Sequence, residues 1–171
     1  LDILSLEKKF DIVESVGVLH HMKNPIKGWK ALTGCLKSGG LMRIGLYSEL
    51  ARKEIALIRE DNSPISHSLS KNDIRNFREK IILSKNNQYK KIKLSSDFYS
   101  LSNFRDLIFN IQEHRFTIPM IKKNFSDLGL QFCGFEDQKL INKFKIYNKG
   151  IGDQYNLNKW ENFEKKNPDI F

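Results

Sequence analysis

The stretch FDIVESVGVLHH, residues 10–21, predicts a buried strand that runs into a functional loop. Its first four residues are rich in strand formers, and the polar pair Glu14 and Ser15 indicates that the strand ends near Ser15. Gly17 follows at a point where the backbone must turn sharply or admit a ligand. Ligands of open parallel sheets bind beyond the carboxyl ends of the strands, so we expect a site within residues 14–21.

The following stretch predicts a helix and a second strand. Residues 25–37 have apolar side chains at helical spacing, Pro25 lies in the first turn, and Gly39-Gly40 is expected to end the helix. Residues 41–47 then predict another strand. Strand, helix and strand together predict one right-handed parallel crossover unit with the two strands side by side.

Two stretches resemble motifs of a known enzyme family: FDIVESVGVLHHMKNP, residues 10–25, and LKSGGLMRIGLYS, residues 36–48. They look like the fourth-strand and fifth-strand motifs of class I S-adenosylmethionine-dependent methyltransferases, whose usual forms are FDxIxxxxVLHH and LKPGGxxxI. The resemblance covers nearly the whole chain. Residues 104–117, 130–136 and 160–171 are similar to a bacterial subgroup often fused to tetratricopeptide repeats.

The resemblance implies an α/β fold, namely a partial Rossmann-like class I methyltransferase fold with about strands four to six and a helical insertion. The GxGxG loop that follows the family's first strand does not occur in the sequence. We therefore expect a C-terminal fragment that lacks the first strands, and whose final antiparallel strand would follow Phe171. Such a fragment is expected to be inactive alone. It should also be poorly soluble or molten, because its sheet has an open edge.

The expected domain organisation follows the family pattern. Residues 1–48 are expected to form the C-terminal part of the cofactor-binding core, and residues 49–116 a helical insertion that covers the methyl-accepting pocket. Residues 117–137 should provide a helix and the sixth strand, which residues 130–136 would form. Residues 138–171 are expected to form a C-terminal helical extension.

The resemblance implies S-adenosylmethionine as the cofactor and four residues that would contact it. Asp2 would accept a hydrogen bond from the adenine amino group, and Ile3 would cover the ring. Asp2 on its own could equally be an ordinary loop carboxylate. Val16 and Gly17 would lie under the methionine end of the cofactor, because they follow the fourth strand.

Three residues are candidates for the catalytic chemistry. A neutral His20 could accept a proton from the methyl acceptor, although packing or hydrogen bonding at a helix entry is the alternative. Tyr47 would face the transferred methyl group from the loop after the fifth strand. His114 could act as an acid or base, unless Thr117 caps the next helix and His114 only fixes the loop. Adjacent His20 and His21 would point about 100° apart on a helical turn, so we expect no metal site.

The expected activity is methyl transfer to a small-molecule or protein acceptor. The alternative is a non-catalytic methyltransferase-like scaffold or a nucleic-acid-binding domain, which the net charge of +9 and the pI of about 9.5 bring into consideration. The positive charge is mostly lysine scattered along the chain, which favours a solvated surface over nucleic-acid binding. The missing N-terminal half of the same chain, with or without tetratricopeptide repeats, is an expected partner.

The two cysteines and the lack of a long apolar run indicate where in the cell the protein is expected. Cys35 and Cys133 both have apolar neighbours, which predicts two buried thiols in a reducing environment instead of a disulfide or a metal site. The sequence has no run of roughly 18 apolar residues, the length that spans a bilayer. We therefore expect a cytoplasmic protein without a membrane partner.

Overall fold

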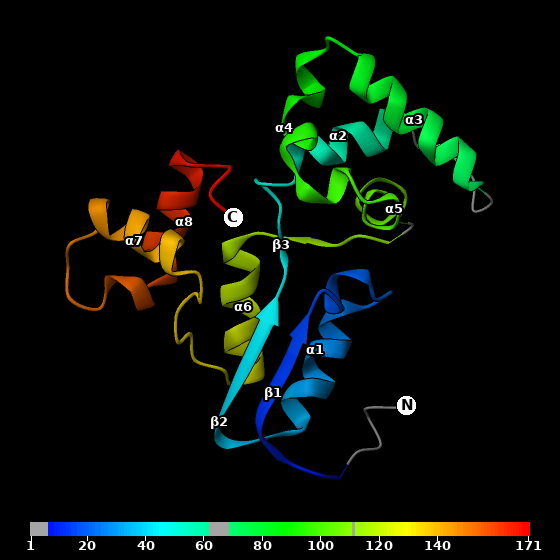
Figure 1. Cartoon of the computed structure of the whole chain (residues 1–171). Coiled ribbons are helices and arrows are strands. Elements are labelled where there is room, and N and C mark those ends of the chain that lie inside the picture. The colour runs from blue at the N-terminus through cyan, green and yellow to red at the C-terminus, as the bar shows by residue number, and fades with distance from the viewer. Residues whose placement is uncertain (1–6, 62–68, 111) are drawn as a thin grey trace. The chain divides into compact units, whose positions relative to one another are not determined.

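The computed structural model describes residues 7–61, 69–110 and 112–171 (Figure 1). The chain divides into two compact units. The first unit unites the described residues up to Ala51 with those from Gln112 onward. The second unit contains the described residues from Arg52 to Asn110.

The first unit begins with a pair of parallel strands joined by a helix. These elements are β1 (Phe10–Val16), α1 (Pro25–Gly34) and β2 (Leu36–Gly45). The side chain of Asn24 accepts a hydrogen bond from the backbone N–H of Lys27, which satisfies a free donor of the first turn and begins the helix where the sequence predicts it. β1 and β2 pair in parallel, so the expected crossover unit is confirmed.

The end of α1 and the start of β2 differ from the prediction. The helix ends at Gly34, and the Gly39-Gly40 pair lies inside β2 instead of before it. The register between the strands shifts near this pair, which is the pattern of a β-bulge. Gly39 has a φ of +75°, and a Cβ on Gly40 would lie 2.9 Å from the backbone oxygen of Asp11. The two glycines therefore serve a strand irregularity and not a helix end.

A second, shorter parallel pair follows in the first unit. β3 (Tyr47–Ser48) pairs with β4 (Arg115–Phe116), and the backbone N–H of Glu49 donates to the oxygen of Phe116 at 3.0 Å. No pattern in the sequence predicts β4. A strand of two residues has no alternation of apolar and polar side chains that a sequence pattern could show.

The expected Rossmann-like methyltransferase fold is wrong for this chain. The described residues are mostly helical, and their strands form two separate two-stranded parallel sheets instead of one sheet of strands four to six. Residues 130–136, expected as the sixth strand, belong to no strand. A strand needs a neighbouring backbone for its hydrogen bonds, and none pairs with this segment within the described chain. Its Phe135 instead packs edge-on against Trp160, with ring centroids 4.7 Å apart.

Three helices complete the first unit. Thr117 caps the start of α6, which is the alternative that the sequence left open, and Gly129 ends that helix with a φ of 65°. Phe144 and Trp160 stack with ring centroids 3.8 Å apart at the centre of an apolar cluster that all three helices share. The helices are α6 (Ile118–Leu128), α7 (Gln138–Tyr147) and α8 (Leu157–Lys166), with short 3-10 turns at Leu19–His21 and Asp153–Tyr155.

The second unit is helical throughout its described residues and has its own apolar core, with Ile81, Phe98 and Phe104 fully buried. Ser70 and Asp73 form a capping box at the start of α3. None of the helices in the described parts of the chain is both long and apolar enough to cross a membrane. The helices of this unit are α2 (Lys53–Asp61), α3 (Lys71–Leu83), α4 (Lys90–Leu94) and α5 (Leu101–Phe109), with 3-10 turns at Asn87–Tyr89 and Ser96–Phe98.

The two cysteines differ in exposure. Cys35 is buried, as expected, but Cys133 is exposed, so the prediction of two buried thiols is wrong for Cys133. The prediction placed Cys133 in a buried sixth strand, and residues 130–136 do not form that strand.

Candidate functional site

The aromatic rings of His20 and Tyr47 stack on each other, with centroids 3.9 Å apart and planes 26° from parallel. His20 lies in the 3-10 turn that follows β1, and Tyr47 begins β3. The edge of His21 meets the His20 ring at a centroid distance of 4.3 Å. Two of the three predicted catalytic residues are therefore in direct contact, beyond the carboxyl ends of β1 and β2.

The course of the chain after β1 explains how His20 reaches this position. Gly17 adopts a φ of +76°, which turns the backbone away from the strand direction. Leu19 and His20 are then each only 1% exposed, so the turn is anchored in the interior of the unit. The packing alternative that the sequence left open for His20 therefore has structural support, and its catalytic role stays a prediction.

The segment before β4 holds this turn from the other side. The backbone N–H of His114 donates to the backbone oxygen of His20 at 2.7 Å. A ring nitrogen of His21, Nδ1, lies 2.8 Å from the backbone oxygen of Gln112. The structure thus brings His114 to the same place as His20, but the contact that it records uses the His114 backbone.

The predicted cofactor contacts lie partly outside the described residues. Asp2 and Ile3 fall among residues 1–6, which the structure does not describe. Val16 is the last residue of β1 and is 51% exposed, and a Cβ built on Gly17 would have no atom within 4 Å. Val16 and Gly17 therefore offer an apolar side chain and an accessible backbone beside the turn that carries His20.

Sequence reasoning did not identify Glu164 as part of this region. The hydroxyl of Ser48 donates a hydrogen bond of 2.5 Å to Oε1 of Glu164, although 116 residues separate them in sequence. Glu164 is only 4% exposed, and this burial raises the pKa of its carboxyl group. The Ser48 oxygen in turn accepts a hydrogen bond from the backbone N–H of Ala51 at 3.1 Å. No local pattern connects α8 with β3, so only the folded structure shows the pair.

Arg115, in the segment before α6, forms an ion pair within the first unit. Nε of Arg115 lies 3.3 Å from a carboxylate oxygen of Glu49. The pair links the two short strands β3 and β4, since Glu49 directly follows Ser48 and Arg115 begins β4. The neighbouring His114 therefore lies in a segment whose conformation the ion pair fixes, which agrees with the alternative that His114 only fixes the loop.

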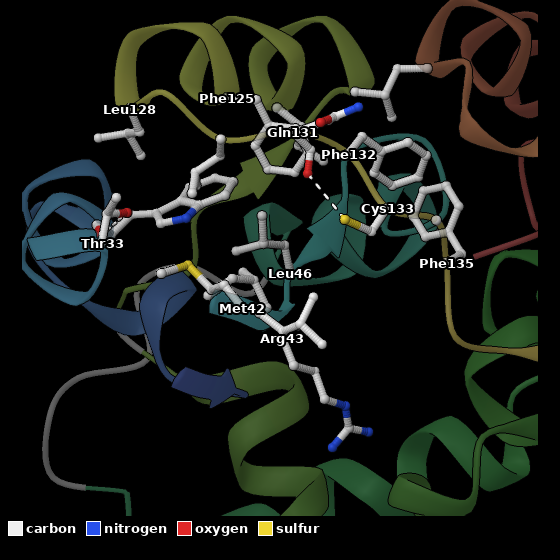
Figure 2. A pocket seen from close by; sticks show the side chains of 18 of the residues that line it. Thr33, Met42, Arg43, Leu46, Phe125, Leu128, Gln131, Phe132, Cys133 and Phe135 are labelled. Atoms are coloured by element: carbon white, nitrogen blue, oxygen red, sulfur yellow. Dashed lines mark hydrogen bonds between the residues drawn. The ribbon is translucent and has the colours of Figure 1, made fainter. Parts of the chain in front are cut away.

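A cavity of about 830 Å³ opens beside the stacked pair, within the first unit (Figure 2). β2, α1, α6 and residues 128–136 line it, and Tyr47, Ser48 and Glu164 lie at its border. Its volume falls in the range that is usual for small-molecule sites, roughly 300–1,000 Å³. Within the described chain, no three His, Cys, Asp or Glu side chains come together in a way that could hold a metal ion.

Comparison with known proteins identifies an uncharacterized relative. No family model matches the chain. The sequence is 25% identical over 179 residues to an uncharacterized protein of Synechococcus sp., and the match covers 95% of this chain. It covers 41% of that relative, so the chain spans less than half the length of the curated protein that it resembles.

Proposed function

We propose that this chain contributes to S-adenosylmethionine-dependent methyl transfer to a small-molecule or protein acceptor. The carrying observation is the stacked pair of His20 and Tyr47. His20 lies in the 3-10 turn that follows Val16 and Gly17 beyond the carboxyl end of β1. The motifs of residues 10–25 and 36–48 support the same activity by their resemblance to methyltransferases. The proposal concerns the chemistry alone and does not depend on a Rossmann-like sheet.

Methyl transfer requires few polar side chains from the protein. The sulfonium of the cofactor supplies an activated methyl group, so the protein mainly has to align the reactants and provide at most one base. In our proposal the Gly17 backbone allows the cofactor to approach closely. His20 accepts the proton of the acceptor, and the stacked ring of Tyr47 holds the His20 imidazole in one orientation.

The second unit has a role in the same proposal. The described residues between Arg52 and Asn110 lie between the two halves of the first unit in sequence and are mostly helical, and an inserted helical segment can set acceptor choice without altering the cofactor site. We also propose that an N-terminal half of the same protein, with or without tetratricopeptide repeats, is a partner of this chain. The proposed location is the cytoplasm. Cys35 and Cys133 are not joined in a disulfide, which supports a reducing compartment.

Calorimetric titration with S-adenosylhomocysteine tests the cofactor assignment, with the natural full-length protein and the 171-residue chain compared side by side. We expect binding with a Kd on the order of micromolar by the full-length protein. The 171-residue chain should bind much more weakly. Absence of binding to both would contradict the proposal and favour the non-catalytic scaffold or the nucleic-acid-binding domain.

A pair of glycine variants makes the test specific to the site. Gly17 and Gly152 have φ values of +76° and +81°, and a Cβ on either would have no atom within 4 Å, so alanine introduces the same backbone strain at both. We expect Gly17→Ala in the full-length protein to weaken S-adenosylhomocysteine binding at least about tenfold. Gly152→Ala should leave it unchanged. Equal effects would mean that Gly17 acts only through stability.

The His20→Ala variant addresses the catalytic role once an acceptor is known. Normal turnover by this variant would exclude His20 as the base. A loss of kcat with unchanged cofactor binding would support the role, because only the proton transfer would have been removed.

A further inference from the structure

Four large apolar side chains within residues 82–99 of the second unit are exposed to solvent. Leu83 is 73% exposed at the end of α3, and Leu94 is 80% exposed at the end of α4. Ile82 and Tyr99 are each more than half exposed. The apolar core of this unit is built from other residues, so these four side chains contribute to its surface. Large apolar side chains that gather on a surface indicate an interaction site.

Hydrogen bonds hold together the backbone segments that carry these side chains. Nζ of Lys93 donates to the backbone oxygen of Ile82 at 3.1 Å, which ties α4 to the last turn of α3. The hydroxyl of Tyr99 donates to the backbone oxygen of Lys93 at 3.0 Å, and Leu94 follows Lys93 in sequence. Ile82, Leu83, Leu94 and Tyr99 therefore lie near one another, and we call these four residues the α3–α4 patch.

Positive charge accompanies the α3–α4 patch. Residues 80–96 contain five lysines and no aspartate or glutamate. Of these lysines, Lys85 and Lys90 are exposed. Nη1 of Arg78 on α3 donates to the backbone oxygen of Tyr99 at 3.1 Å, which adds a further cation beside the patch. The second unit thus presents apolar and basic side chains together on one part of its surface.

Basic side chains of the first unit are arranged differently. Arg43 on β2 donates through Nε to a carboxylate oxygen of Glu136 at 2.6 Å, and the same guanidinium contacts Glu14 on β1. These two carboxylates offset the charge of Arg43 within the protein. The lysines of residues 80–96 have no acidic residue in their own segment, so this segment favours an anionic partner.

We propose that the α3–α4 patch binds the surface of an anionic lipid bilayer. Leu83 and Leu94 enter the boundary between headgroups and acyl chains, and the Tyr99 ring lies at the level of the headgroups. The lysines extend their ammonium groups to the lipid phosphates. This contact needs no spanning helix, so it revises the expectation of no membrane partner, which rested on the lack of a long apolar run.

The composition of the patch fits a lipid surface better than another macromolecule. The cores of protein–protein interfaces are depleted of lysine, and a polar nucleic acid would leave the exposed leucines without apolar contact. A covering segment of the same protein would have to take ammonium groups out of water, which is costly unless acidic partners are buried with them. Both ends of the second unit also lead into the first unit, so any chain outside residues 1–171 continues from the first unit and not from α3 or α4.

Cosedimentation of the full-length protein with lipid vesicles tests the proposal. One set of vesicles contains phosphatidylcholine alone, and the other contains phosphatidylcholine and phosphatidylserine in equal parts. We expect the partition coefficient to be at least about tenfold higher for the anionic vesicles and to fall as salt is added, because salt screens the attraction of the lysines. Absent binding, or equal binding to both sets, would overturn the proposal. Binding of duplex DNA without binding of vesicles would overturn it in favour of a nucleic-acid surface.

A serine variant of the patch tests the apolar contact. Leu83→Ser combined with Leu94→Ser should lower the partition coefficient at least about tenfold. Ile151→Ser is the control and should leave it unchanged, because Ile151 is also fully exposed but lies in the first unit. The replaced side chains are exposed, so circular dichroism should show an unaltered fold. Equal partitioning of the leucine variant and the wild type would overturn the proposal, as expected if another part of the protein covers the patch.

Charge reversal separates the patch from the net charge of the whole chain. Lys85→Glu with Lys90→Glu changes the net charge by the same amount as Lys143→Glu with Lys145→Glu, which replaces two exposed lysines of α7. We expect the first pair to lower the partition coefficient for anionic vesicles at least about tenfold and the second pair to lower it much less. Equal losses would overturn the proposal, because the overall positive charge would then explain the binding.

Discussion

The hydroxyl group of Ser48 donates a 2.5 Å hydrogen bond to the buried carboxyl group of Glu164, and this bond links β3 to the last helix of the chain. Burial is the main cause that raises the pKa of Glu164, and the hydrogen bond from Ser48 opposes it. The folded state therefore favours the protonated acid more than the unfolded state does. The pair has consequences for stability that can be measured against pH.

We expect Glu164→Gln to stabilise the protein at neutral pH relative to the wild type. A raised pKa contributes stability below the unfolded value near 4.5, and this contribution is lost as pH rises through the folded pKa. Glutamine has no charge to desolvate and can still accept from Ser48. Urea unfolding at pH 7 and pH 4 would show the gain at pH 7 and little difference at pH 4. A larger gain at pH 4 would contradict the assignment.

Ser48→Ala should destabilise the protein by about 1–3 kcal/mol at neutral pH, because a buried carboxylate loses its donor. The loss should shrink in acid, where Glu164 is protonated. Chemical denaturation at both pH values gives the free energies of unfolding. Ser102→Ala, a change at the surface of α5, serves as the control and should shift stability by less than about 0.5 kcal/mol.

Gly40→Ala should destabilise the protein, because its Cβ would lie 2.9 Å from the backbone oxygen of Asp11 on the paired strand. We expect a loss of about 1–3 kcal/mol, as for other overpacked positions. Gly34→Ala is the matched control, since a Cβ there meets no atom within 4 Å and Gly34 ends a helix. It should be neutral or stabilising by up to about 1 kcal/mol. Thermal unfolding of both variants would check the contrast.

Phe144→Ala should remove the centre of the apolar cluster of the first unit. Phe144 is fully buried and stacks on Trp160, so we expect a loss of about 3–5 kcal/mol. Ile146 lies on the same helix but is 63% exposed, and Ile146→Ala should cost much less. Equal losses in denaturant unfolding would contradict the packing described for α7.

The 171-residue chain expressed alone should be poorly soluble or molten, so the unfolding measurements above refer to the full-length protein. β2 has one edge without a strand partner in the described chain, and apolar side chains such as Ile12 and Leu41 are 67% and 60% exposed on the strand pair. Light scattering and near-ultraviolet circular dichroism would measure aggregation and fixed packing. A sharp cooperative melt of this chain would contradict the expectation.

The helix that begins at Pro25 could be predicted because contacts between residues close in sequence determine where it begins. The capping box of Ser70 and Asp73 depends on equally local contacts. The pairing of β1 with β2 was also predicted, but the absence of a sixth strand from the described chain could not be predicted in the same way. Residues 130–136 alternate as a strand does, but a strand forms only where a neighbouring backbone is free to pair, and no pattern within the segment states that.

In the candidate site, too, residue positions could be predicted from the sequence but contacts between distant residues could not. The sequence identified His20 and Tyr47 separately, from their positions after two strands, but their stacking depends on the 3-10 turn that returns His20 toward β3. Nothing in the sequence indicates that Glu164 is buried, because a glutamate on an amphipathic helix is ordinarily solvated. Its role arises from the packing of α8 beside Ser48.

The contacts of Arg43 restrict which cation this position can carry. Most of the positive charge of the chain is lysine, yet Arg43 lies between two carboxylates and meets Glu136 through Nε and Glu14 through Nη1. Guanidinium donors are spread over a rigid plane, whereas an ammonium group concentrates its donors at one atom. A lysine at this position would preserve the charge but bring two mutually repelling acids toward a single nitrogen. Lysine and arginine are therefore not exchangeable at position 43, although net charge alone would treat them as equal.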